Sequence, residues 1–395
     1  MISITKLYCG KSGPGDKLRY QRQAITSSDA SNGADSDRKP IVVWNSTDRC
    51  NLNCIHCYAN ADNSTGHREL TTEQARNMIR QLADFGVPVL LFSGGEPLLR
   101  ADVYDNAALA NSLGIRTVLS TNGTLITEQV AEHLKQAGFS YIGISLDGIG
   151  DLNDEFRGKR GAFESAKRAF EICAAYGLRS GLRMTLTRYN YNQIEQVFEF
   201  VEQQRISRVC FYHLVYSGRG SELVKADLSH EESRRAVDLI INYAADFNRR
   251  GLDVEILTVD NHCDGPFLYM RMLRERSPLA SEALQLLKAN GGNSSGIGIA
   301  AIDKEGNVHP DQFWRHYSLG NVMERPFGDI WTDTRDPILA GLRHRKSLLR
   351  GRCASCRWLD ICNGNFRVRA EAVYGDVWYQ DPACYLTDKE IGAAE

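Results

Sequence analysis

The chain contains no long run of apolar residues. None of its hydrophobic stretches approaches the roughly 20 residues that a membrane-spanning helix needs. The first 20 residues, MISITKLYCGKSGPGDKLRY, lack the apolar core of roughly 7–15 residues that a secretion signal carries. The formal net charge of only −2 gives little electrostatic attraction for nucleic acid or for an anionic membrane. We therefore expect a cytoplasmic protein that binds neither.

Length and composition allow a large hydrophobic core. With 395 residues, 43% of them hydrophobic, the chain suffices for one large α/β barrel with a smaller appendage, or for two to three ordinary domains. Beyond an alternation of strand-like and helix-like segments we find no internal repeat. Residues 26–38, TSSDASNGADSDR, contain no aliphatic side chain larger than alanine, which predicts a flexible linker.

Behind this linker, apolar strand-like runs alternate with amphipathic runs. A helix is expected from Thr71, where Gln74 completes a capping box, to Gly86. Six nearly continuous apolar strands imply a parallel sheet covered by helices, with its chemistry at the carboxyl ends of the strands. The strand-like runs are Ile41–Thr47, Val87–Phe92, Ile115–Ser120, Tyr141–Leu146, Leu182–Leu186 and Val209–Val215, and helix-like runs include Phe163–Tyr176 and Asn192–Glu202. From about Ser217 the periodicity weakens.

Eleven cysteines are distributed unevenly along the chain. Seven lie in two tight groups, and Cys9, Cys173, Cys210 and Cys263 are scattered, with Cys173 and Cys210 expected to be buried and inert. Because cytosolic thiols are kept reduced, clustered cysteines in a chain without an export signal indicate metal ligands or catalytic thiols before disulfides.

The first group, Cys50-x3-Cys54-x2-Cys57, follows the first strand directly. Three crowded thiolates suit one 4Fe–4S cluster, whose four irons normally take four cysteines, and leave one iron open for another ligand. A zinc ion with His56 as fourth ligand is the alternative, although structural zinc sites usually pair two separated knuckles. Redox-active thiols are a third interpretation.

The second group, Cys353-x2-Cys356-x5-Cys362-x21-Cys384, supplies four ligands. Four thiolates close a coordination shell, so this group can hold one complete 4Fe–4S cluster, with a zinc ribbon as the alternative.

Polar, glycine-rich motifs follow the strands in order. They are SGGEP (93–97), STNGT (120–124), SLDG (145–148), Arg183 within the fifth strand, and YHLVYSGRG (212–220). Each motif alone is typical of a turn. Their order behind a CxxxCxxC loop, here CNLNCIHCY, resembles the radical S-adenosylmethionine (SAM) superfamily, with His56 where an aromatic residue is usual.

The resemblance implies an enzyme with an α/β fold, a partial (β/α)6 TIM-type barrel carrying a small C-terminal iron–sulfur extension of the SPASM/twitch type. It implies that Cys50, Cys54 and Cys57 hold the catalytic cluster, whose open iron binds SAM, and that Cys353, Cys356, Cys362 and Cys384 hold an auxiliary cluster. Carried over position by position, the SAM contacts are Tyr58, Gly94, Gly95, Glu96, Ser120, Asn122, Ser145, Asp147, Arg183 and Leu214.

A closer resemblance, spanning nearly the whole chain, is to haem-biosynthetic radical SAM proteins. It rests on VPVLLFSGGEPLLR, GGNSSGIGIAAIDKEGNVHPDQFW, LGNVMERPFGDIW and the C-terminal cysteine segment. One branch removes two acetate side chains from 12,18-didecarboxysiroheme to give iron-coproporphyrin III; a second, the haem d1 branch, acts on propionates. The N-terminal SITKLYCG favours the first branch. Both imply a tetrapyrrole substrate and an external electron donor such as a ferredoxin or flavodoxin.

A polycarboxylate macrocycle needs guanidinium groups for its carboxylates and aromatic surface for its ring. The C-terminal third offers such groups, and we expect substrate contacts from Arg367, Arg369, His309 and Arg315. A solvated arginine or a satisfied histidine is the structural alternative at each position.

Four segments are expected. They are residues 1–38 as an N-terminal segment and linker, 39–220 as the core barrel, 221–340 as a connecting and substrate-facing region, and 341–395 as the auxiliary cluster domain. Two rival functions remain, a peptide-modifying radical SAM maturase and a non-catalytic zinc-binding protein. The first 40 residues are short for the peptide-recognition domain that such maturases often carry.

Overall fold

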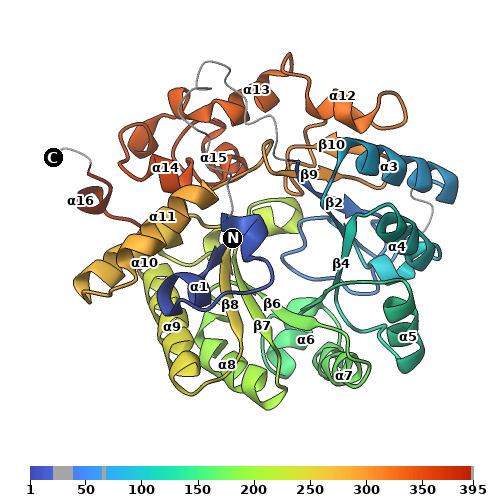
Figure 1. Ribbon diagram of the computed structural model, residues 1–395, viewed down its shortest axis with the longest axis horizontal. Coiled ribbons are helices and arrows are strands. Elements are labelled where there is room, and N and C mark those ends of the chain that lie inside the picture. Colours follow the sequence, from blue (N-terminus) through green and yellow to red (C-terminus); the bar gives the residue numbers. More distant parts are fainter. Residues whose placement is uncertain (21–38, 65–67, 393–395) are drawn as a thin grey trace.

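The computed structural model describes residues 1–20, 39–64 and 68–392, and they form one continuous sheet of eleven strands (Figure 1). The order across the sheet is β1-β8-β7-β6-β5-β4-β3-β2-β9-β10-β11. The strands are β1 Ile2–Ser3, β2 Ile41–Asn45, β3 Val89–Ser93, β4 Arg116–Thr121, β5 Ile142–Ser145, β6 Ser180–Leu186, β7 Arg208–His213, β8 Glu255–Val259, β9 Ile299–Ile302, β10 Asn307–His309 and β11 Gly320–Asn321. The linker expected at 26–38 lies outside the described residues.

The six expected strands all form, as β2 to β7, and they lie side by side in sequence order and parallel to one another. The α/β prediction is confirmed. The alternation does not end near Ser217, however, because β8 continues the parallel sheet beyond β7 and β9 joins it in parallel at the far edge of β2. Antiparallel strands β1 and β11 form the two ends, so the barrel is partial.

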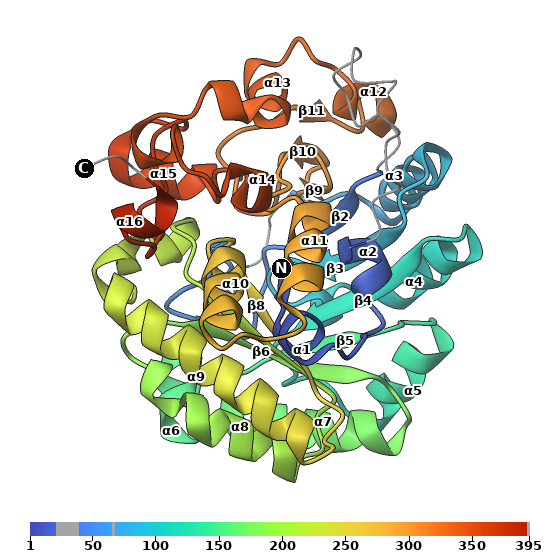
Figure 2. The same ribbon diagram turned by 60° about the vertical axis from the view of Figure 1, so that its left-hand side comes forward.

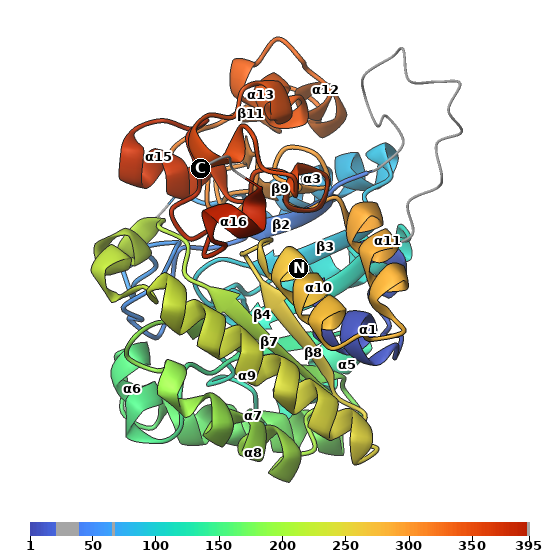
Figure 3. The same cartoon turned by 90° about the vertical axis from the view of Figure 1, so that its left-hand side faces the viewer.

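Helices cover the outer face of the curved sheet, and the C-terminal helices gather at one end of the molecule (Figures 1 and 3). The helices are α1 Ile4–Cys9, α2 Asp16–Tyr20, α3 Thr72–Phe85, α4 Val103–Ser112, α5 Glu128–Gln136, α6 Asp151–Arg157, α7 Ala162–Ala175, α8 Ile194–Gln203, α9 His230–Arg249, α10 Asp264–Arg274, α11 Ala280–Asn290, α12 Phe327–Trp331, α13 Pro337–Arg343, α14 Leu359–Cys362, α15 Arg367–Tyr374 and α16 Asp388–Ile391. Within the described residues, none has the length and apolar character needed to cross a bilayer.

Helix α3 shows how local sequence and packing agree. The capping box between Thr71 and Gln74 is present, and Gly86 ends the helix in the left-handed conformation. Met78, Ile79 and Leu82 are completely buried against the sheet. Each such side chain contributes about 1.5–3 kcal/mol by leaving water, which fixes this helix on the main core.

The first 20 residues belong to the sheet. Strand β1 pairs antiparallel with β8 through Ile2 and Ser3, and the side chains of Ile2, Ile4 and Leu7 are buried in the main core. Figure 2 shows α1 beneath α10 and α11, at the edge of the sheet formed by β8. In the described part of the N-terminal segment, these residues therefore extend one end of the sheet and do not form a separate appendage.

Candidate active site at the carboxyl ends of the strands

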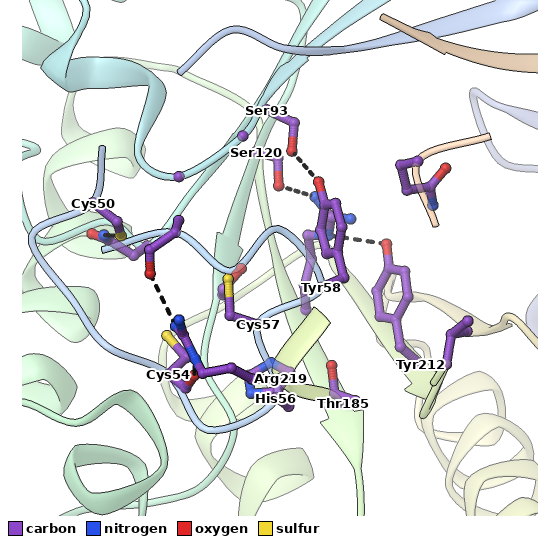
Figure 4. Close-up of a pocket in the computed structure, with 18 of the residues that line it drawn as sticks. Cys50, Cys54, His56, Cys57, Tyr58, Ser93, Ser120, Thr185, Tyr212 and Arg219 are labelled. Atoms are coloured by element: carbon purple, nitrogen blue, oxygen red, sulfur yellow. Dashed lines mark hydrogen bonds between the residues drawn. The ribbon is translucent and has the colours of Figure 1, made fainter. Parts of the chain in front are cut away.

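The first three cysteines lie on the loop that leaves β2. Cys50 and Cys54 are buried, Cys57 is half-buried, and all three line one pocket. Figure 4 shows the three side chains around one end of this pocket, with Tyr58 and Tyr212 away from Cys50 on its other side. Burial raises the pKa of Cys50 to about 12. The thiol therefore keeps its proton until a metal displaces it.

Hydrogen bonds from distant elements hold this cysteine loop in place. The guanidinium of Arg219 donates to the carbonyl oxygens of Cys54 and Ala61, at 2.8 and 3.0 Å. The backbone N–H groups of Asn53 and Ile55 donate to carbonyl oxygens at the end of α6. The loop is thus fixed from the segment that follows β7 and from α6, so its three sulfur atoms are presented together before any ligand arrives.

One of the thiols already has a cationic partner. Nη1 of Arg157 lies 3.7 Å from Sγ of Cys54, and Nη2 lies 2.5 Å from Oδ2 of Asp147. A guanidinium at a ligand sulfur stabilises the negative charge that an iron–sulfur cluster brings. Asp147 therefore acts indirectly, by holding the guanidinium of Arg157 beside the cysteine loop.

The contacts of the His56 imidazole do not suit a zinc ligand. Its Nε2 lies 3.3 Å from Oδ2 of Asp147, and its ring packs on Phe156 at 4.8 Å between centroids. Burial lowers the pKa of His56 to about 4, so the imidazole is neutral at physiological pH. Its one contact with a carboxylate and its packing fit a supporting role beside the cysteines.

The pocket has an empty volume of about 1120 Å³, including its open mouth. Eight of the ten residues expected to contact SAM line it, and the other two, Glu96 and Asp147, lie behind its surface. The eight are Tyr58, Gly94, Gly95, Ser120, Asn122, Ser145, Arg183 and Leu214.

Glu96 lies completely buried beneath the pocket floor. Its carboxylate accepts hydrogen bonds from the Thr121 hydroxyl and from the backbone N–H groups of Asn122 and Leu98, at 2.8 to 3.1 Å. Burial raises the pKa of Glu96 to about 7, although each of these three bonds opposes the increase. The side chain orders the ends of β3 and β4.

Gly94 and Gly95 allow the cysteine loop to approach the end of β3 closely. Gly94 has φ +126°, and a Cβ atom there would collide with the carbonyl oxygen of Thr47, while one at Gly95 would collide with that of Arg49. The N–H of Gly95 also donates to Thr47 O at 2.7 Å. These glycines allow the loop to pack directly on the end of β3.

Arg183 projects from β6 into the pocket. Its Nε donates to the hydroxyl of Tyr212 at 2.9 Å, its Nη1 donates to Ser120, and the guanidinium lies 4.9 Å from the Tyr212 ring. Three strands thus combine to fix one cation, which presents a positive charge to any carboxylate bound there.

The four cysteines of the second group lie near one another in the C-terminal region. Cys362 lies within electrostatic range of Cys353, Cys356 and Cys384, and burial raises its pKa well above that of a free thiol. Cys263, at the start of α10, lies against Cys384, and its thiol hydrogen bond lowers the pKa of Cys384. The four expected ligands are therefore brought together, with a fifth thiol that the sequence did not place there.

Both cysteine groups offer thiol donors alone, the usual ligands of iron–sulfur clusters. Among the described residues, no three His, Cys, Asp or Glu side chains converge closely enough to hold one metal ion. A 4Fe–4S cluster holds its ligands farther apart, one on each iron, so the all-cysteine donor sets fit that group.

The four side chains expected to contact substrate do not line the pocket, and the structure gives each another partner. Arg369 is completely buried and pairs with Asp381, with Nη2 at 2.9 Å from Oδ2. Arg367, also buried, donates to the carbonyl oxygens of Gly364, Val377 and Tyr379. These two guanidiniums hold the C-terminal segment together.

His309 and Arg315 are engaged as well. Nδ1 of His309 lies 2.8 Å from the carbonyl oxygen of Tyr317, and its Nε2 lies 3.5 Å from Asp303. Arg315 pairs with Asp48 at 3.0 Å. Their sequence neighbours Gln312 and Phe313, by contrast, do line the pocket.

Several pocket residues were missed by the sequence analysis. They include Arg157, Thr185, Asp260 and Gln312, whereas Tyr212, His213 and Arg219 lie within the expected motif at 212–220. For Asp260 a signal existed, because a polar residue directly follows the strand Glu255–Val259, as at the ends of the other strands. The contact of Arg157 with Cys54 joins residues 103 positions apart, so no local sequence pattern predicts it.

Comparison with known proteins agrees with this geometry. The family model of the radical SAM superfamily matches residues 44–201, which span the cysteine loop and strands β3 to β6. The chain is also 54% identical, over the full length of both proteins, to the Fe-coproporphyrin III synthase of Methanosarcina barkeri.

The chain belongs to the radical SAM superfamily.

This radical SAM enzyme therefore uses SAM and a 4Fe–4S cluster. It is also 42% identical to the pre-heme d1 synthase of Dinoroseobacter shibae, over 90% of this chain and 88% of the relative. Its fold is similar to that of Streptococcus suis SuiB bound to S-adenosylmethionine, with a TM-score of 0.70, 21% identity, and coverage of 88% of this chain and 78% of SuiB. The zinc-binding, non-catalytic interpretation is wrong, because the superfamily consists of cluster-dependent enzymes.

Proposed function

We propose that this radical SAM enzyme removes the two acetate side chains of 12,18-didecarboxysiroheme and so forms iron-coproporphyrin III. The observation that carries the proposal is the 54% identity to an Fe-coproporphyrin III synthase over the whole of both chains. The match to a pre-heme d1 synthase is lower, at 42%, and shorter. The haem d1 reaction on propionates is therefore the second candidate.

Cys50, Cys54 and Cys57 would hold the catalytic cluster, with Arg157 stabilising the charge on the sulfur of Cys54. When bound, this cluster supplies the electron that splits SAM into methionine and a 5′-deoxyadenosyl radical, which abstracts a hydrogen atom from the substrate. The protein's part is to bind and orient. We assign the carboxylate of SAM to Arg183, and the rest of the cofactor to Tyr58, Ser120, Asn122, Ser145 and Leu214.

Glu96 and Asp147 would then act through their neighbours. Glu96 orders the backbone of Asn122 from below, and Asp147 holds Arg157 against the cysteine loop. We expect both carboxylates to position cofactor contacts without touching the cofactor, since neither lies on the pocket surface.

Cys353, Cys356, Cys362 and Cys384 would hold a second 4Fe–4S cluster in a domain of residues 341–395. Their mutual proximity and partial burial support this assignment. When bound, the second cluster supplies a site for electron transfer. We further propose that an external carrier such as a ferredoxin or flavodoxin delivers the electrons, and that the enzyme works in the cytoplasm, where thiols remain reduced.

Replacing Cys353 by alanine should remove the second cluster alone. Iron per chain is expected to fall by about four atoms, the content of one 4Fe–4S cluster, while 5′-deoxyadenosine formation without substrate continues. Iron and sulfide analysis of anaerobically purified protein measures this. Cys9→Ala, which changes a half-buried thiol distant from both groups, serves as the matched control. Unchanged iron in the Cys353→Ala protein would contradict the second cluster.

The decisive test of function is anaerobic incubation with 12,18-didecarboxysiroheme, SAM and a reductant, followed by the product mass. Loss of two acetate groups is the expected result. Change at the propionates would instead assign the haem d1 reaction. Absence of any tetrapyrrole product would leave the peptide-maturase interpretation, which the identity to haem-biosynthetic relatives disfavours.

A further inference from the structure

Asp260 is a buried carboxyl group that the proposed mechanism does not use. It follows β8 directly, lines the pocket, and has only 7% of its surface exposed. The described residues give its oxygen atoms no hydrogen bond or ion pair; the charges that act on it through space are the Met1 ammonium, Arg369 and Arg183, which lower its pKa, and Asp311, which raises it. A carboxyl buried to this extent without a partner is costly unless a ligand completes it.

The backbone holds this side chain in place. Asp260 has φ +65°, a left-handed conformation that a residue other than glycine keeps only when its surroundings impose it. Asn261 imposes it by donating from Nδ2 to Ala383 O at 2.9 Å and by accepting from Asn365 Nδ2 at 2.7 Å. The carboxyl is therefore presented to the pocket by a loop fastened to the second cysteine segment.

The cationic groups of the same pocket are already engaged. Arg157 pairs with Asp147, Arg219 donates to the cysteine loop, and Arg183 donates to Tyr212 and Ser120. Asp260 and Gln312 are two further polar residues of this lining, and within the described residues Oε1 of Gln312 is buried without a partner, as is Nδ1 of His56.

Their position separates them from the cofactor motifs. The superfamily match ends at residue 201, whereas Asp260 and Gln312 lie beyond it in the chain. Neither residue is among the expected SAM contacts, although β8 lies beside β7, whose end carries the expected contact Leu214. Groups that lie outside the shared cofactor framework but inside the reaction pocket are placed to recognise the substrate.

We propose that Asp260 binds an acetate arm of the tetrapyrrole, by a hydrogen bond from its protonated carboxyl group to the carboxylate of that arm. This inference rests on the proposed function. Burial raises the pKa of Asp260 to about 6, and a second carboxylate beside it raises that pKa further. The two carboxyls then share one proton, as coupled carboxyl pairs do. No bond to carbon changes in this step, and the proton stays within the pair.

The test compares Asp260→Gly with Asp260→Asn in the complete enzyme. Glycine removes the carboxyl while accepting the left-handed backbone, so folding is preserved. Asparagine also tolerates this conformation and keeps a donor, its amide N–H. Each variant is titrated anaerobically with 12,18-didecarboxysiroheme and with iron-coproporphyrin III, which lacks the acetates. Iron content and 5′-deoxyadenosine formation without substrate are measured alongside.

Asp260→Gly is expected to weaken didecarboxysiroheme binding by about 10-fold to 100-fold, the range for losing a hydrogen bond to a charged group. Asp260→Asn should stay within about 3-fold of wild type, since its amide still donates. Product binding, iron content and substrate-free SAM cleavage should not change.

Three results would overturn the proposal. They are equal weakening of substrate and product, equal loss in Asp260→Asn and Asp260→Gly, or unchanged substrate affinity in Asp260→Gly. If the wild-type enzyme itself fails to bind didecarboxysiroheme, the proposed function fails; if it binds and only these variants disagree, the assignment of Asp260 alone fails.

Discussion

Cys54→Ala protein is expected to form no measurable 5′-deoxyadenosine from SAM under reducing conditions. Two thiolates and a neighbouring guanidinium cannot replace three thiolates, so the catalytic cluster is lost or loses the iron that SAM requires. Because the uncatalysed reaction is negligible, the rate should fall by more than about 1,000-fold. Anaerobic assay of 5′-deoxyadenosine by chromatography, with iron counted per chain, measures both effects.

The matched control is Cys173→Ala, which removes a completely buried thiol within α7. It loses a comparable side chain without touching either cysteine group, so its cleavage rate and iron content should equal those of the wild type. Normal 5′-deoxyadenosine formation by Cys54→Ala would refute the catalytic cluster at this loop. A loss shared by both variants would indicate a general folding defect.

Asp381→Asn protein is expected to be destabilised by about 3–5 kcal/mol, because the change leaves the guanidinium of Arg369 buried without its counter-charge. Both side chains are fully inaccessible in the structure. Asp381 also accepts backbone hydrogen bonds from Phe366 and Ala383, so it organises the segment between Cys362 and Cys384. Thermal unfolding of the anaerobic protein measures the effect as a lower melting temperature.

The same variant decides between two roles for Arg369. Didecarboxysiroheme affinity per folded molecule should be unchanged, because Arg369 does not reach the pocket. Glu231→Gln, which breaks an exposed pair with Arg235, is the control and should hardly alter the melting temperature. A stable Asp381→Asn protein with impaired substrate binding would restore the substrate role that the sequence suggested.

Local patterns explain which expectations were confirmed. The strands β2 to β7 are the nearly continuous apolar runs that a buried parallel sheet requires. The capping box of Thr71 and Gln74 predicts the start of α3. Helix α9 has the same kind of signal, since Ser229 and Glu232 form a capping box. Together with the apolar strand that follows, this signal could have shown that the barrel continues past Gly220.

For the candidate site too, local sequence patterns predicted some features and not others. Cysteine spacing and polar motifs at strand ends are local in sequence, and they predicted the loop and most of the pocket wall. The partner of an arginine is set by whichever acceptor the fold brings to it. The sequence could not show this for Arg367 and Arg369, which we expected to bind substrate. In the fold they are surrounded by carbonyl oxygens and a carboxylate.

The sequence by itself determined the superfamily chemistry of this protein, because thiol spacing and strand-end motifs need only a few consecutive residues to be recognised. The tertiary structure alone decided which charged groups are available to a ligand. Burial and pairing depend on contacts between residues far apart in the chain, such as Arg157 with Cys54 and the loop that presents Asp260 to the pocket.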